Sequence, residues 1–171
     1  VQILKELKGI KFDKGTKDFQ PTNLEITKIN IDNSADNVIP GLACASFNIR
    51  FNNKHSSNTL KSKINKIVKK ICNKNKSKYK IEYNVSGEAF LTSPNETTYM
   101  IQNTIKKITK IKPRLSTTGG TSDARFIRKI SPCLEFGLVG KTMHKVDEVV
   151  ALKDLKKLTL IYSNILENYF K

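Results

Sequence analysis

The sequence has no tryptophan, only three cysteines and only two histidines in 171 residues. The cysteines are odd in number, and none of Cys44, Cys72 and Cys133 stands in a C-x-x-C pair, which argues against a disulfide framework and a structural zinc site. All three lie in apolar runs, so we expect buried thiols in a reducing compartment. A zinc site takes three or four ligands, and the sequence shows no cluster of that kind.

Long apolar runs are also absent. No segment reaches membrane-spanning length, and the first residues lack the layout of a signal peptide, so we expect no membrane partner. The chain begins with Val1 in the middle of a helical pattern, which fits the continuation of a longer polypeptide. With 38% hydrophobic residues, it can bury a core as one domain or as two small ones.

Arginine is scarce although the formal net charge is +16. Lysine supplies nearly all the positive charge and is spread along the chain, while the arginines are Arg50, Arg114, Arg125 and Arg128. Arginine is the residue favoured for bidentate contacts with phosphates and bases. A solvated lysine surface is therefore favoured over a nucleic-acid-binding patch, and no nucleic-acid partner is expected.

Residues 1–91 show the order helix, strand, strand, helix, strand. The expected ranges are a helix end over 1–7, strands over 23–31 and 42–51, a helix from Ser56 or Ser57 to Asn73, and a strand over 79–86. In the second strand, apolar Phe47, Ile49 and Phe51 alternate with polar residues. The helix from Ser56 or Ser57 is expected to bury a stripe that comprises Leu60, Ile64, Ile67, Val68 and Ile71. This order is most of a ferredoxin-like β-α-β-β-α-β sandwich without its first strand. Because that strand is normally central, we expect unpaired strand edges and uncovered apolar surface.

Residues 92–171 alternate helices with a short strand, which is typical of part of an α/β domain. A capping box at Ser93-Pro94-Asn95-Glu96 predicts a helix to about Lys110. Further helices are expected over 122–130 and 152–169, with a buried strand over 133–136 between them. The apolar stripe of the last helix is predicted to comprise Leu155, Leu158, Tyr162, Ile165, Leu166 and Tyr169.

Residues 116–126 are the segment best suited to chemistry. A Gly119-Gly120 pair lets the backbone approach a ligand closely, because neither residue has a Cβ. Asp123 and the preceding hydroxyls can cap the helix over 122–130, whose N-terminus would favour an anion such as a carboxylate. The alternative is an ordinary glycine-containing turn before a helix.

Several motifs in register resemble the succinyl-diaminopimelate desuccinylase family, within a metal-dependent peptidase and deacylase superfamily that also holds acetylornithine deacetylase and carboxypeptidase G. They are D-N-V-I-P-G at 36–41, F-N-I-R-F at 47–51, S-G-E-A-F-L-T at 86–92, T-T-G-G-T-S-D-A-R-F at 117–126, C-L-E-F-G-L at 133–138 and T-M-H-K-V-D-E at 142–148. The resemblance covers essentially the whole chain. It implies an α/β protein with an incomplete ferredoxin-like α+β lid/dimerisation domain at 1–91, followed by the C-terminal part of a zinc-peptidase-like α/β catalytic domain at 92–171.

The resemblance implies one metal ligand. His144 in T-M-H-K matches the family's last ligand, which binds one of two zinc ions, with cobalt as a possible substitute. Considered alone, a single histidine is more often a structural or surface residue than a ligand, and only the resemblance reverses this preference. No segment matches the family's H-x-D motif or the Glu-Glu pair that holds its general base, so no catalytic residue is assigned. We expect the other histidine, His55, to be solvent-exposed.

The resemblance also implies five substrate-binding residues, namely Asn37, Arg50, Ser86, Gly120 and Thr121. Arg50 is physically suited to grip a succinyl carboxylate with two hydrogen bonds. Each of the first three has a structural alternative: a turn residue at positive φ for Asn37, an ion pair with a neighbouring acid for Arg50, and a strand-end hydroxyl for Ser86.

One motif departs from the family pattern. Many desuccinylases have G-P-x-N-A-T-I-H before the ligand histidine, whereas this sequence has G-L-V-G-K-T-M-H over 137–144. Gly140 therefore stands in place of a substrate-binding asparagine, and Leu138 in place of a proline. The change removes a polar contact and puts full desuccinylase efficiency in doubt.

The resemblance implies the C-terminal portion of a cytoplasmic enzyme that hydrolyses N-succinyl-LL-2,6-diaminopimelate to succinate and LL-diaminopimelate, in lysine and peptidoglycan synthesis. A homodimer through the lid and an N-terminal half carrying the remaining metal ligands are the implied partners, and the chain alone is expected to be inactive. The alternatives are a non-catalytic lid/dimerisation module, the remnant of a decaying gene, and a related deacylase such as acetylornithine deacetylase.

Overall fold

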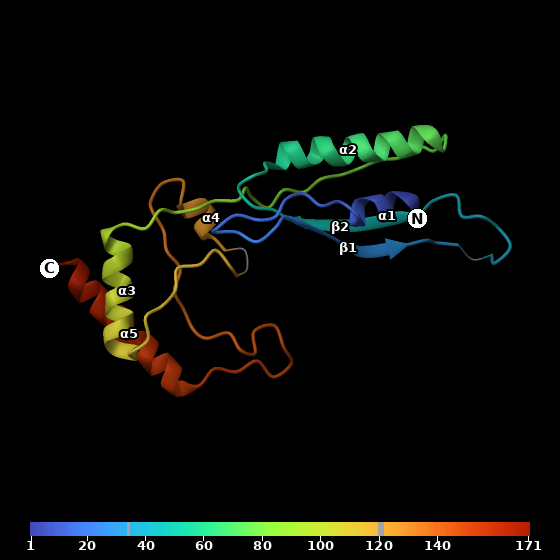
Figure 1. Ribbon diagram of the computed structural model, residues 1–171. Helices are drawn as coiled ribbons and strands as arrows, with labels where there is room; N and C mark the ends of the chain where they lie inside the picture. Colours follow the sequence, from blue (N-terminus) through green and yellow to red (C-terminus); the bar gives the residue numbers. More distant parts are fainter. Residues whose placement is uncertain (34, 120–121) are drawn as a thin grey trace. The chain divides into compact units, whose positions relative to one another are not determined.

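The computed structural model describes residues 1–33, 35–119 and 122–171. Its contacts form two compact units, Val1–Leu91 and Thr92–Lys171. Figure 1 colours the first from blue to yellow-green and the second from yellow-green to red. In the part of the chain that the structure describes, no helix has both the length and the apolar character needed to cross a bilayer.

The first unit is built on a two-stranded antiparallel sheet. Its elements are α1 (Gln2–Lys8), β1 (Asn23–Asn30), β2 (Cys44–Arg50) and α2 (Ser57–Lys74). Asn23 pairs with Arg50 at one end and Asn30 with Cys44 at the other, with an irregularity between Ile26 and Lys28. Figure 1 shows both helices over the same face of this hairpin.

The core of this unit lies between α2 and the hairpin. Its buried residues are Leu7 of α1, Leu24 of β1, and Ile64, Val68 and Cys72 of α2. Phe47 and Ile49, on alternate positions of β2, pack against this cluster, as the sequence pattern predicted. The predicted stripe and start of α2 are also confirmed, since the Ser56 hydroxyl accepts a hydrogen bond from the Thr59 N–H in a capping box.

The strand predicted over 79–86 is not formed. This segment packs on the core through Ile81 and Tyr83, and the Tyr83 hydroxyl donates to Asn65 Oδ1 over 3.1 Å. Within the described residues, however, β1 and β2 form the only sheet and have only each other as partners. A strand needs a neighbouring backbone to complete its hydrogen bonds, and in a ferredoxin-like order the last strand pairs with the first. Residues 79–86 therefore remain extended without a ladder.

Glu88 fixes the end of this extended segment to α2. Both of its carboxylate oxygens accept from the Ser57 N–H, at 3.2 and 3.1 Å. The first turn of α2 has no acidic residue of its own. Glu88 therefore supplies the negative charge that favours a helix N-terminus.

The second unit consists of α3 (Glu96–Thr109), α4 (Ala124–Ile127) and α5 (Leu152–Tyr169), with α3 packed on α5. The strand predicted over 133–136 is wrong, because the structure assigns no strand to the described part of this unit. The reason is again the lack of a neighbouring strand. The helix predicted over 122–130 is limited to the four residues of α4, followed by turns.

Two details of the long helices differ from the prediction. The capping box of α3 joins Asn95 to Thr98, not Ser93 to Glu96, because Asn95 adopts the extended backbone of an N-cap. The range of α5 is confirmed, but its buried residue is Ile161, which is 2% exposed. Four residues of the predicted stripe are at least 44% exposed, because α3 covers only one narrow side of α5; they are Leu155, Tyr162, Leu166 and Tyr169.

The cysteines only partly follow the prediction. Cys72 is buried in the core, Cys133 is intermediate, and Cys44 is exposed. Successive side chains of a strand point to opposite faces of the sheet. Cys44 stands three residues before Phe47, so its side chain points to the face opposite Phe47 and Ile49, away from the helices. The prediction of a buried thiol at position 44 is therefore wrong.

We predict that Ile64→Ala lowers the free energy of unfolding of the first unit by about 2–5 kcal/mol, since it leaves a cavity at a fully buried site. The matched control is Ile67→Ala, which truncates a half-buried side chain at the edge of the same cluster and should cost less. Denaturant unfolding followed by circular dichroism measures both. Equal losses would contradict the placement of the core.

Candidate functional site

Two of the predicted substrate residues in the first unit lie at opposite ends of the hairpin. Arg50 pairs with Asn23 at the end that leads into α2, whereas Asn37 lies in the turn that joins β1 to β2. At about 3.4 Å per residue, the seven residues of β2 separate these ends by about 20 Å. Both side chains are exposed. The structure therefore does not bring Asn37 and Arg50 together within one copy of this unit.

Ser86 belongs to the same end of the unit as Arg50. It stands two residues before Glu88, whose carboxylate is bound to Ser57 at the start of α2. Arg50 precedes the same helix along the chain, and both Arg50 and Ser86 are exposed. An exposed guanidinium and hydroxyl at one end of the unit suit recognition of a carboxylate.

The predicted residues Gly120 and Thr121 lie outside the residues that the structure describes. Immediately before them, Gly119 has φ of 137°, and a Cβ built on it meets no atom within 4 Å. Glycine is thus favoured at 119 by its backbone conformation, not by a close approach. The predicted capping by Asp123 is wrong, because its side chain makes no cap hydrogen bond. With only four helical residues, α4 does not provide the anion site expected at its N-terminus.

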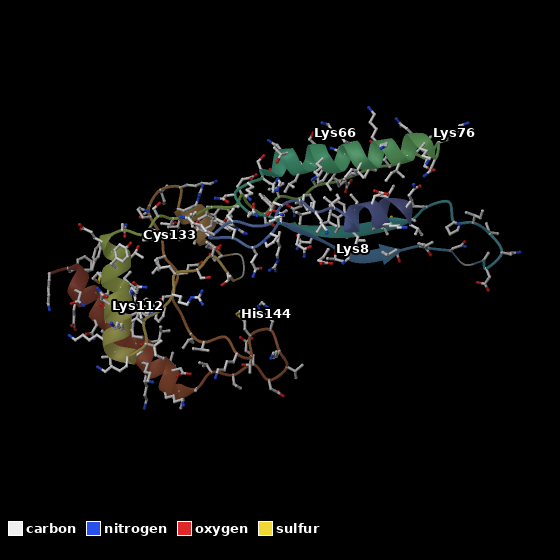
Figure 2. All side chains as sticks on the ribbon, in the orientation of Figure 1. Lys8, Lys66, Lys76, Lys112, Cys133 and His144 are labelled. Atoms are coloured by element: carbon white, nitrogen blue, oxygen red, sulfur yellow. The ribbon has the colours of Figure 1, made fainter. Side chains whose placement is uncertain are left out.

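His144 lies exposed on the loop that precedes α5 (Figure 2). Its backbone has φ of 64°, in the left-handed region that few residues with a side chain adopt. Lys145 N–H donates to the Thr142 carbonyl over 3.0 Å, which closes a tight turn around Met143 and His144. The loop therefore presents the imidazole to solvent from a constrained backbone.

Gly140 lies at the start of this turn, where its carbonyl accepts from the Met143 N–H over 3.3 Å. A Cβ at position 140 would come within 3.3 Å of Met143 Cβ. An asparagine here, as in the family motif, would require a small displacement of Met143.

His144 fits one position of a metal site but does not form one by itself. Among the described residues there is no group of three or more histidine, cysteine, aspartate or glutamate side chains that could hold a metal ion. Zinc needs three or four ligands. An exposed imidazole on a held loop is suited to complete a site whose other donors lie elsewhere.

An open groove of about 540 Å³ lies along α3, lined by Tyr99, Met100, Asn103, Thr104 and Asn168 among others. The amide of Asn168 donates to the Thr104 hydroxyl over 3.2 Å across one side of it. None of the predicted site residues that the structure describes lines this groove.

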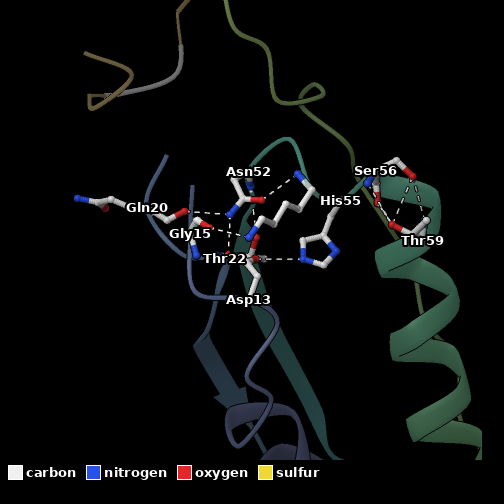
Figure 3. A network of polar contacts seen from close by, with 9 residues as sticks. Asp13, Gly15, Gln20, Thr22, Asn52, His55, Ser56 and Thr59 are labelled. Atoms are coloured by element: carbon white, nitrogen blue, oxygen red, sulfur yellow. Dashed lines mark hydrogen bonds and ion pairs between the residues drawn. The ribbon is translucent and has the colours of Figure 1, made fainter. Parts of the chain in front are cut away.

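The second histidine is not solvent-exposed, and that prediction is wrong. The side chain of His55 is 19% exposed, and its Nε2 lies 3.0 Å from Asp13 Oδ2 (Figure 3). The Asp13 side chain is 6% exposed and also accepts from Asn52 Nδ2 at 2.7 Å and from the Thr22 N–H at 3.2 Å. This network ties the loop before β1 to the turn that follows β2.

The network keeps Asp13 ionised. Burial by itself would raise the pKa of this carboxyl, but hydrogen bonds from the Thr22 hydroxyl, the Gly15 N–H and the Asn52 amide outweigh it and hold the pKa well below the ordinary value of 3.8. The sequence carried a signal for this turn in Asp13-Lys14-Gly15, since an aspartate side chain commonly accepts from the backbone N–H two residues on, as Asp13 does from Gly15. Gly15 has φ of 82°, and a Cβ there would lie 2.7 Å from the Phe19 carbonyl oxygen, so glycine is required.

Comparison with known proteins shows which protein family the chain belongs to. Residues 4–168 match the model of peptidase family M20/M25/M40. The chain therefore belongs to this family of hydrolases.

Three of the similar proteins share one name. The chain is 78% identical over 170 residues to the succinyl-diaminopimelate desuccinylase of Pelagibacter ubique (strain HTCC1062), which covers 99% of this chain and 44% of that protein. It is 47% identical to the succinyl-diaminopimelate desuccinylase of Rickettsia bellii (strain RML369-C) over 97% of this chain and 42% of that protein. The corresponding protein of Wolbachia pipientis wMel is 41% identical over 99% of this chain and 42% of its own length. The chain thus spans less than half the length of these relatives.

Asp13→Asn is expected to destabilise the first unit by about 1–3 kcal/mol, because an amide cannot accept all the hydrogen bonds that the carboxylate accepts. The wild-type free energy of unfolding is expected to fall as the pH drops below about 4, because the folded-state pKa of Asp13 lies below the unfolded value. The stabilisation is complete above the unfolded pKa and is lost as the pH falls toward the folded-state pKa. Asp13→Asn should flatten that acid dependence.

Urea unfolding at a series of pH values between about 2 and 7 measures this effect. The control is Asp32→Asn, which changes an exposed carboxylate outside the network and should leave the acid dependence unchanged. An Asp13 variant with the wild-type pH profile would show that the network does not hold the charged form.

Proposed function

We propose that the chain is the C-terminal portion of a succinyl-diaminopimelate desuccinylase. The observation that carries the proposal is the 78% identity to a protein of that name along nearly the whole chain. The complete enzyme would hydrolyse N-succinyl-LL-2,6-diaminopimelate to succinate and LL-diaminopimelate, in lysine and peptidoglycan synthesis, in the cytoplasm.

Within that enzyme, His144 would be one ligand of a site for two zinc ions, with cobalt as a possible substitute. Such ions polarise a carbonyl group and make a bound water nucleophilic at neutral pH. His144 supplies a single imidazole, so the remaining donors and the general base would come from residues outside this chain. By itself the chain would therefore not hydrolyse the substrate.

Arg50 and Ser86 would bind the substrate from one end of the lid. The exposed guanidinium can form two parallel hydrogen bonds with the succinyl carboxylate, and the Ser86 hydroxyl can add a third contact from the same end of the unit. Gly120 and Thr121 would contact the substrate backbone or carboxylate from the catalytic part.

Asn37 would act at a different place from Arg50. The hairpin separates the two residues by about 20 Å. This separation is longer than one small substrate molecule can span, so Asn37 and Arg50 would not contact the same substrate within one copy. A homodimer through the lid would give each end of the hairpin its own active site. In this proposal residues 1–91 are an incomplete ferredoxin-like lid/dimerisation domain, and residues 92–171 are the C-terminal part of the catalytic domain.

A second candidate is a non-catalytic interaction module. It is favoured by the open sheet of the first unit, since each described strand has a hydrogen-bonding neighbour on one side only. Unpaired strand edges are sites for pairing with another chain. In this case the chain would bind a partner through an added strand and would take no part in hydrolysis.

We predict that succinate is released from N-succinyl-LL-diaminopimelate when the chain is mixed with the upstream portion of the enzyme and zinc, and that neither portion is active alone. His144→Ala should abolish this activity, because a metal ligand is lost. The matched control is Lys141→Ala, an exposed change in the same loop, which should retain it. A mixture that binds tightly but releases no succinate would favour the interaction module, and equal rates on acetyl substrates would favour a related deacylase.

For the same mixture, Arg50→Ala is expected to lower kcat/KM by about 30-fold or more, mainly through KM, since truncating one partner of a hydrogen-bonded charge pair costs about 2 kcal/mol or more. Arg50→Lys keeps the charge but loses the paired geometry and should recover only part of the loss. Lys28→Ala, an exposed change in β1, serves as the control. Unchanged kinetics in Arg50→Ala would remove Arg50 from the substrate site.

A further inference from the structure

We propose that Thr142 and Glu148 are positioning residues, which hold the loop that presents His144 in one conformation. The inference rests on the proposed role of His144 as a metal ligand, and it adds the two side chains that set its direction. Neither side chain belongs to a metal-binding group of its own in the described part of the chain.

The backbone of the loop is strained, so other contacts must stabilise its conformation. His144 and Asp147 have φ of 64° and 57°, whereas most residues with a Cβ avoid this region because the Cβ comes too close to the following carbonyl oxygen. The turn closed by Lys145 N–H has His144 in its third position with positive φ, and Met143 is not among the residues with positive φ. That pattern matches a type II turn, which normally has glycine or asparagine at this place. Such conformations persist only where the surrounding contacts fix them.

Thr142 provides the stronger of two contacts that fix the loop. Its hydroxyl donates to the Val149 carbonyl over 2.9 Å and accepts from the Val149 N–H over 3.0 Å. One side chain thus closes both ends of the loop over 142–149 and satisfies both backbone groups of Val149. The Thr142 side chain is partly buried, although its neighbours in the loop are exposed.

Glu148 provides the second contact, directly on the histidine. One of its carboxylate oxygens accepts from the His144 N–H at 3.4 Å, within the loop that Thr142 closes. The N–H of a residue at positive φ points away from its usual partners, so this carboxylate satisfies a group that the turn leaves open. Together, the contacts made by Thr142 and Glu148 fix the backbone conformation at His144. They therefore fix the direction in which the Cα–Cβ bond of His144 leaves the loop.

A fixed side-chain direction favours metal binding, because the loop is already ordered and loses no conformational entropy when the metal binds. Residues that orient a ligand typically change metal affinity by about 10–100-fold when they are mutated. Thr142 and Glu148 would act in this way through the backbone of His144, without touching the metal or the substrate.

The test is nuclear magnetic resonance of the full chain without metal, in wild type and Thr142→Val. Val keeps the shape of threonine but removes both hydrogen bonds. In the wild type we expect a strong amide-to-Hα NOE within His144, which marks positive φ, and a slowly exchanging Val149 amide. In Thr142→Val both features should weaken, with amide exchange at Val149 faster by about 10-fold or more, while the amide signals of α5 remain.

Two conservative variants make the outcome decisive. Thr142→Ser keeps the hydroxyl and should retain both features, and Glu148→Gln keeps an accepting oxygen and should retain the His144 NOE that Glu148→Ala weakens. A Thr142→Val spectrum identical to the wild type at His144 and Val149 would overturn the inference. If Thr142→Val loses the α5 signals as well, the Thr142→Ser and Glu148→Ala comparison decides it.

The consequence for metal binding is measured in the mixture with the upstream portion, by competition with a chelator. Thr142→Val should weaken zinc affinity by about 10–100-fold and Lys141→Ala should not. If His144→Ala leaves zinc affinity unchanged, the proposed function fails while the loop result can stand. If His144→Ala weakens zinc binding and Thr142→Val does not, the positioning role alone is wrong.

Discussion

The requirement that every strand find a hydrogen-bonding neighbour governs this structure. Within the described residues, one pair of strands meets it, β1 with β2, and α1 and α2 pack on that hairpin to form the core of the first unit. Where no neighbour is present, extended segments rich in apolar residues remain without a ladder, at 79–86 and at 133–136. In the second unit, many large apolar side chains are exposed, including Val146 at 91%. The missing neighbours fit the chain's coverage of less than half of its relatives' length.

Elements whose signal is local were predictable from the sequence. The structure confirms four such predictions: the buried stripe of α2, the capping at Ser56, the alternation of Phe47 and Ile49, and the range of α5. Each of these depends only on residues nearby in the sequence. The strands over 79–86 and 133–136 depend on partners distant in sequence, so their composition alone misled. The buried face of α5 was misplaced for the same reason, since the position of α3, and not the hydrophobic pattern, decides that Ile161 is covered.

The roles of the candidate site residues stay predictions, and the sequence did not indicate their geometry. The motifs pointed to His144, Arg50 and Ser86, but no pattern indicated that the hairpin would place Asn37 far from Arg50. The partner of His55 was missed because Asp13 lies 42 residues away along the chain and meets it only in the fold. The left-handed backbone of His144 was also hidden, since the residues that fix it, Thr142 and Glu148, look like ordinary polar loop residues in the sequence.

In the proposed enzyme, this chain supplies one imidazole to a metal site completed by other residues. The most direct measurement uses the chain labelled with ¹⁵N at histidine, mixed with the unlabelled upstream portion and loaded with ¹¹³Cd in place of zinc. A one-bond coupling between ¹¹³Cd and a ring nitrogen of His144 is the predicted result, with none at His55. A bound metal without coupling to either histidine, or coupled to His55 instead, would contradict the account.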